Sequence, residues 1–195
     1  MVSAMATMST INDRPAPLEP PPGLVLVQDF INTLHMDGLL HEDAIATPQA
    51  LEHWLSERKL LRGRHKLNEA DVAHAVSVRE SLRDLLAANE GKRVAQGAVE
   101  TLGRAARSAQ LLVDFEPEGS ARLRPAATGV DAALGEILAH TFRAMTEGSW
   151  RRLKSCHDER CRWAFYDRSK NHSGHWCSMA SCGNRAKARR FRAKP

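Results

Sequence analysis

The chain has 195 residues, of which 43% are hydrophobic and 26% are charged, a balance typical of globular proteins. No apolar run approaches the ~20 residues that cross a bilayer, and no basic-led hydrophobic segment with a small-residue cleavage site opens the chain, so we exclude a membrane-spanning protein and expect a cytoplasmic one. The net charge of +5 is uneven: residues 1–150 hold 15 Lys and Arg against 20 Asp and Glu, whereas residues 151–195 hold 13 against 3.

The first 22 residues are expected to form a disordered leader, because five of the nine prolines lie between Pro15 and Pro22 and nothing there is periodic. Residues 23–148 follow as a helical domain. Residues 24–35 are apolar on almost every side, which predicts a buried helix, with the start of a strand as the alternative. Thr47 and Pro48 predict the next helix start, with Thr as the N-cap and Pro at the first helical position.

Three longer helices are predicted from their caps and apolar spacing. Asn68 and Asp71 form a capping pair that opens a helix to about Asn89, which Gly91 ends. Helices at 95–112 and 130–147 each carry one apolar stripe: Val99, Leu102, Ala106 and Ala109 in the first, and Val130, Leu134, Ile137, Leu138, Thr141, Phe142 and Met145 in the second. Between them, Leu111–Phe115 and Ala121–Pro125 flank a Pro-Glu-Gly turn. The predicted fold class is mainly α with a small β-hairpin.

Arg79 falls in the middle of the buried stripe of the 68–89 helix, where a guanidinium needs an anionic partner. Asp29 and Asp131 are the candidates for that partner. Two interpretations stay open: a structural ion pair, or a small-molecule pocket in which Asp29, Asn32 and Arg79 hold an acidic effector.

All four cysteines lie in the last 40 residues, after a predicted domain boundary at Gly148-Ser149. Their spacing is Cys-x4-Cys, then fifteen residues, then Cys-x4-Cys, a pattern typical of zinc sites. Residues 149–195 are too few to build much of a core without such a staple. We predict that zinc is bound by Cys156, Cys161, Cys177 and Cys182. Two disulfides, a redox switch that releases zinc, or a histidine ligand (His157, His172 or His175) remain as alternatives.

A strongly basic helix is predicted after Cys182, because Ala, Lys and Arg favour helix and too little of its surface is apolar for burial. Phosphate is the expected partner of its six cations, namely Arg185, Lys187, Arg189, Arg190, Arg192 and Lys194. The alternative is a solvated, frayed tail. Upstream, Trp163, Phe165 and Trp176 are expected to form a small core, and Tyr166 is the better candidate for nucleic-acid contact.

Residues 177–187, which contain Cys182, Gly183, Asn184 and Arg185 in succession, resemble the signature of the CGNR zinc-finger proteins, named for those four residues. Residues 163–169 and 175–177 also fit that family. The family usually has two basic residues just before Trp176, where this chain has Gly-His.

Those proteins carry an N-terminal ABATE domain, described as a stress-induced transcription regulator. Residues 26–34, 46–55 and 78–83 resemble segments of that domain. The resemblance implies that the four cysteines are zinc ligands and that the protein is a DNA-binding transcriptional regulator, responsive to stress or a ligand through its helical domain.

We therefore predict a DNA-binding regulator, plausibly a homodimer because one small module presents little surface for specific binding. A zinc-stabilised module that binds RNA or protein without reading DNA sequence is the alternative. No enzyme is predicted, because the sequence lacks a phosphate-binding Gly-rich loop, a nucleophile elbow and a His-Glu-x-x-His motif, and four thiolates leave zinc no open position.

Overall fold

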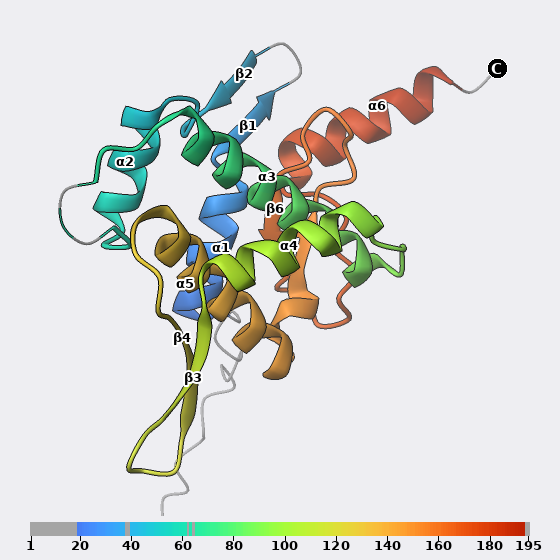
Figure 1. Ribbon diagram of the computed structural model, residues 1–195. Helices are drawn as coiled ribbons and strands as arrows, with labels where there is room; N and C mark the ends of the chain where they lie inside the picture. Colours follow the sequence, from blue (N-terminus) through green and yellow to red (C-terminus); the bar gives the residue numbers. More distant parts are fainter. Residues whose placement is uncertain (1–18, 38–39, 62, 64, 194–195) are drawn as a thin grey trace, which may run out of the picture.

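The computed structural model describes residues 19–37, 40–61, 63 and 65–193, so most of the predicted leader and Lys194 lie outside the described residues. The chain is mainly helical with small antiparallel strand pairs (Figure 1). The α-helices of the described residues are α1 (Pro22–Ile31), α2 (Pro48–Glu57), α3 (Glu69–Leu85), α4 (Gln96–Ser108), α5 (Gly129–Thr146) and α6 (Asn184–Arg192). Short 3-10 turns at Leu86–Glu90 and Ser149–Arg152, and a π-type turn at Met179–Gly183, join some of them.

The helix starts that the sequence predicted are confirmed. Thr47 caps α2 by accepting a hydrogen bond from the Ala50 N–H at 3.2 Å, and Pro48 is the first residue of that helix. Asn68 and Asp71 form a reciprocal capping box at α3. Gly91 adopts the left-handed conformation, with φ of 75°, and ends the segment that continues α3. Capping depends only on neighbouring residues, so these features follow directly from the sequence.

The described strands form three separate hairpins: β1 (Leu34–Asp37) with β2 (Leu40–Asp43), β3 (Leu111–Phe115) with β4 (Ala121–Pro125), and β5 (Leu153–Ser155) with β6 (Ala164–Tyr166). The β3–β4 hairpin is the one predicted. The β1–β2 hairpin corrects the prediction of a helix over 24–35, because α1 ends at Ile31. Asn32 follows the last residue of α1, and its side chain hydrogen-bonds the Ala164 backbone in β6, 132 residues further along the chain.

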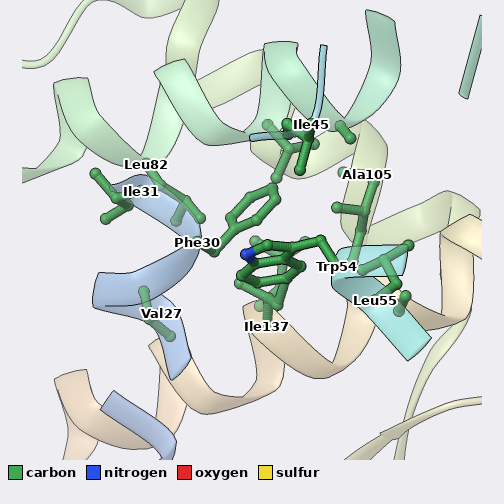
Figure 2. Packing of buried hydrophobic residues seen from close by; sticks show 14 of the residues in the cluster. Val27, Phe30, Ile31, Ile45, Trp54, Leu55, Leu82, Ala105 and Ile137 are labelled. Atoms are coloured by element: carbon green, nitrogen blue, oxygen red, sulfur yellow. The ribbon is translucent and has the colours of Figure 1, made fainter. Parts of the chain in front are cut away.

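The core lies between α1, α2, α3 and α5 (Figure 2). The Phe30 and Trp54 rings meet at 5.5 Å between centroids, and Ile31, Leu55 and Ile137 are fully buried around them. Burial of such side chains contributes roughly 1.5–3 kcal/mol each, so this cluster supplies most of the driving force for folding.

Two predicted stripes need correction at their edges. Phe142 and Met145 of α5 are exposed, at 53% and 40%, whereas Thr141 is buried as predicted and Ala144 extends the buried stripe. In α4 the buried residues are Ala98 and Ala105, and Val99 is 48% exposed. Apolar spacing therefore predicts the buried side of a helix but not which residues at its margin are buried, since tertiary contacts decide which of them are covered.

The C-terminal segment packs against the helical part. Leu153 and Ala164, from β5 and β6, are fully buried in the same cluster as the helices. The Asn32 amide makes two hydrogen bonds of 2.8 Å with the Ala164 backbone, and Arg83 donates to the carbonyl oxygens of Ile31 and Arg162. Within the described residues, no helix combines the length and apolarity needed to span a bilayer.

Candidate metal centre and nucleic-acid interface

Four cysteine thiols converge at the base of α6. The sulfur atoms of Cys156, Cys161, Cys177 and Cys182 all lie within 4.8 Å of one another, and Cys156, Cys161 and Cys182 are buried. The Sγ atom of Cys177 is 3.7 Å from that of Cys161 and 3.6 Å from that of Cys182. All four cysteines are free, so the arrangement contains no disulfide.

These distances fit a single tetrahedral metal ion. Zinc–thiolate bonds of about 2.3 Å place neighbouring sulfur atoms of a tetrahedron about 3.8 Å apart. The observed separations of 3.6 and 3.7 Å agree with that value, whereas a disulfide brings sulfurs to about 2.05 Å. No histidine belongs to the cluster among the described residues, since His157 bonds Glu90 and stacks on His175.

The thiols also influence one another's protonation. A hydrogen bond from Cys161 is the main reason why the pKa of Cys156 is lowered to about 5, and the same bond raises the pKa of Cys161. Burial and the charge of Cys156 raise the pKa of Cys177 to about 12. Several thiolates are therefore unfavourable at neutral pH unless a cation neutralises them, which is what a metal ion does.

Local structure brings the cysteines together. Cys156 follows β5 and donates its backbone N–H to Trp163. Cys161 closes a turn on the Asp158 carbonyl, and Cys182 lies in the turn at Met179–Gly183. Trp163 and Trp176 pack against the sulfurs, as predicted for a small core, whereas Phe165 is half-buried outside that cluster. Tyr166 packs half-buried against the main cluster, and its contact with nucleic acid stays a prediction.

Asp158 is a buried carboxylate that connects the cysteine cluster to α6. Its side chain is 3% exposed and accepts hydrogen bonds from Arg185 at 3.0 Å and Arg189 at 3.5 Å. Arg185 also reaches the sulfur of Cys182, at 2.9 Å. Burial acts to raise the pKa of Asp158, but the bond from Arg185 and the charge of Arg189 outweigh it, so the pKa is lowered. Asp158 therefore stays ionised and fixes the direction of α6.

The rest of α6 is exposed. It has no buried residue, and Figure 1 shows it extending away from the other elements toward the C-terminus. Lys187 and Arg190 lie on the side of the helix opposite Arg185 and Arg189, because the residues are about 100° apart per position. Within the described part of the chain, the side chains of Lys187, Arg190 and Arg192 make no hydrogen bond or ion pair.

Comparison with known families finds a match for each of two consecutive segments of the chain. Residues 24–148 match the ABATE family, described as a putative stress-induced transcription regulator. The protein belongs to the ABATE family. Residues 152–195 match the CGNR zinc finger, so the four-cysteine cluster lies in a metal-binding module and the resemblance seen in the sequence is confirmed. Neither description names an enzyme. No curated protein matches the chain.

The CGNR finger holds a second buried charge pair. Lys154 donates to Asp167 at 2.8 Å and also to the carbonyl oxygens of His172 and Gly174. Gly174 donates its N–H to Asp167, and a Cβ there would lie 2.9 Å from the Asp167 carboxyl carbon. A side chain at position 174 would therefore crowd the Asp167 carboxylate.

In the ABATE domain, Arg79 is buried at 2% exposure and pairs with Asp43 at 2.7 Å and Glu80 at 2.8 Å. The buried-charge prediction is confirmed, but both candidate partners are wrong: Asp29 is exposed, and Asp131 pairs with His74. Asp43 lies in β2, a strand that sequence periodicity did not reveal.

The structure does not bring the three residues of the predicted ligand pocket together. Asp29 and Asn32 line a shallow depression of about 440 Å³, which Arg79 does not line. The Asn32 amide is committed to the Ala164 backbone, and the Arg79 guanidinium is occupied by Asp43, Glu80 and Thr33. Arg79 therefore has a structural role in holding β2 against α3.

Proposed function

We propose that this protein is a zinc-dependent, DNA-binding transcription regulator whose ABATE domain receives the signal. The family descriptions support the regulator class, and the sulfur separations support zinc as the ion that the finger holds. A cytoplasmic location and a homodimer stay predictions.

The observation that carries DNA binding is the exposed, anchored helix α6. Its first turn is tied to the metal centre through Arg185, Asp158 and Cys182, while Lys187 and Arg190 point away from that anchor. An α-helix with its side chains is about 10–12 Å across and fits the major groove, which is about 12 Å wide. Cations on the outer face then reach the phosphates, and the large apolar side chain that α6 exposes is Phe191.

The test is a salt titration of duplex DNA binding with the zinc-loaded full chain. Each phosphate contact contributes a slope of about −0.9 in log affinity against log salt. Lys187→Ala and Arg190→Ala should each flatten the slope by about one unit and weaken binding to all sequences alike. Arg104→Ala removes an exposed arginine of α4 and should leave the slope unchanged.

Equal slopes for all four proteins would contradict the proposal and favour a solvated helix. The same salt titration with duplex RNA is the second measurement. If RNA binds as tightly as DNA and loses the same slope in Lys187→Ala, the protein is a general nucleic-acid binder, and the interpretation as a DNA regulator fails.

A further inference from the structure

We propose that the groove between the ABATE domain and the CGNR finger binds a small planar aromatic anion. The binding proposal stands on the groove itself, and its regulatory meaning rests on the proposed function. The groove has a volume of about 640 Å³, within the range of about 300–1,000 Å³ typical of ligand sites, and Cys161, Cys177 and Cys182 of the metal centre line one end of it. It is distinct from the depression around Asp29 and Asn32.

Both parts of the protein contribute walls. Gln28 and His35 come from α1 and β1 of the ABATE domain, whereas Trp163, Phe165 and Arg168 come from the finger around β6. A bound molecule would therefore contact both parts at once. β5 and β6 lead directly to the cysteine cluster. A ligand bound in the groove would therefore act on the part of the finger that determines the orientation of α6.

Aromatic rings give the groove its shape preference. Trp163 and Phe165 are half-buried, and His35 meets the Trp163 ring edge-on at 5.2 Å between centroids. Aromatic rings that line one groove favour a flat, unsaturated ligand, since aromatic pairs gain energy beyond simple burial.

Arg168 gives the groove its charge preference. Its guanidinium is half-exposed and pairs only with the exposed carboxylate of Glu19, at 3.0 Å, among the described residues. Such surface pairs contribute about 0–1 kcal/mol, so an incoming anion displaces Glu19 at little cost. Arg185 also lines the groove, but its charge is committed to Asp158 and Cys182.

Gln28 adds a polar requirement. Its side-chain oxygen is buried and has no hydrogen-bond partner in the described residues. A buried polar atom without a partner is unfavourable by about 1–3 kcal/mol. A ligand that carries an N–H or O–H donor beside its ring would satisfy this oxygen, which narrows the class to aromatic anions with such a donor.

A nucleic-acid strand fits this groove less well than a small molecule. The cations that line it are Arg168 and Arg185, and Arg185 is already committed to Asp158 and Cys182. A long polyanion needs a row of available cations, whereas a single anionic group needs only Arg168.

The experiment uses anilinonaphthalene sulfonate, a fluorescent aromatic anion with an N–H donor, and the zinc-loaded full chain. We expect saturable binding at one site per chain. Arg168→Gln should weaken it about tenfold or more, because it removes a charge-assisted hydrogen bond to the anionic group. Gln28→Leu should weaken it as well. Arg151→Gln removes an exposed arginine of the same finger that does not line the groove, and should change the affinity less than about twofold.

Unchanged dye affinity in both Arg168→Gln and Gln28→Leu would overturn the proposal and locate the dye elsewhere, for instance at the exposed Phe115. If the dye does not bind but a single-stranded oligonucleotide binds in an Arg168-dependent manner, the groove is a nucleic-acid site instead. Duplex DNA binding that depends on Lys187 and Arg190 is measured on the same proteins, so failure of the regulator proposal and failure of this one give different results.

Discussion

Arg79 is the largest side chain that the fold buries completely, and its energetics depend on two carboxylates from different elements. A buried ion pair adds little net stability over an apolar replacement, but removing one partner leaves an uncompensated charge. The residue-level consequence is that single truncations at buried charges are far more damaging than truncations at exposed ones.

Arg79→Ala should lower the free energy of unfolding by about 3–5 kcal/mol, because Asp43 loses its partner in a half-buried position. Arg104→Ala, at an exposed position on α4, should change it by less than about 0.5 kcal/mol. Urea unfolding followed by circular dichroism measures both. A loss below 0.5 kcal/mol for Arg79→Ala would mean that the guanidinium is not buried.

Asp167 should make the CGNR finger sensitive to acid. Burial acts to raise its pKa, but hydrogen bonds from Lys154, Ser169 and Gly174 outweigh it, so the folded-state pKa lies below the unfolded value of about 3.9. This contribution to stability is fully present above that unfolded value and is lost as the pH falls toward the folded one. Asp167→Asn should lower stability at pH 7 and flatten its decline below about pH 4. An unchanged acid profile in thermal unfolding would contradict this.

At the scale of elements, two helix glycines differ in the space that a side chain would find. Gly135 in α5 faces the start of the β3–β4 hairpin, and a Cβ there would lie 2.7 Å from the Cβ of Ala109 and 2.9 Å from that of Pro125. Gly103 in α4 has one neighbour, the end of the Arg107 side chain, at 3.5 Å. The same substitution should therefore have opposite effects in the two helices.

Gly135→Ala should destabilise the protein by about 1–3 kcal/mol, because neither backbone-linked neighbour can move aside easily. Gly103→Ala should stabilise it by roughly 0.5–1 kcal/mol, since alanine loses less conformational freedom in a helix interior. Thermal unfolding of the two variants against the wild type measures the difference in sign. Equal shifts in one direction would show that helix propensity alone decides both sites.

At the scale of the whole molecule, the finger and the ABATE domain share one core. The Asn32–Ala164 bonds, the Arg83 bonds and the burial of Leu153 all cross between the two parts. Metal binding should therefore stabilise both. Structural zinc contributes roughly 10–16 kcal/mol in finger peptides, far more than a typical margin of stability.

The purified protein should contain one zinc ion per chain, and chelation with EDTA should lower the unfolding temperature of the ABATE helices as well as disorder the finger. Cys177→Ser should reproduce both effects without a chelator, because it removes a sulfur from the cluster. Elemental analysis and circular dichroism report metal and helix separately. Full metal content in Cys177→Ser would disprove the four-cysteine assignment.

Asn32→Ala should uncouple the two parts, because it removes both hydrogen bonds to the Ala164 backbone and leaves a buried N–H and carbonyl without partners. We expect the single unfolding transition to broaden or split, while zinc content stays at one per chain. His53→Ala serves as the control, because His53 lines the same depression as Asn32 and its side chain is exposed. A sharp, unshifted transition in Asn32→Ala would show that the junction contributes little.

The sequence by itself determined the features that depend on residues close along the chain. The Thr47 cap, the Asn68–Asp71 capping box and the β3–β4 hairpin each involve contacts over a few positions. The Cys-x4-Cys spacing likewise predicts a metal site, because each pair comes from one short turn. These local hydrogen bonds and spacings leave few alternatives to consider.

Only the tertiary structure decided the long-range partners. Asp43 rather than Asp29 neutralises Arg79. The Asn32 side chain, at the end of α1, bonds the Ala164 backbone in a strand 132 residues away. Asp158 pairs with Arg185 and Arg189 on one side of α6 and leaves Lys187 and Arg190 on the other. A carboxylate and a guanidinium attract each other wherever the fold brings them together, so composition and periodicity leave many equivalent pairings, and the packing of the shared core selects among them.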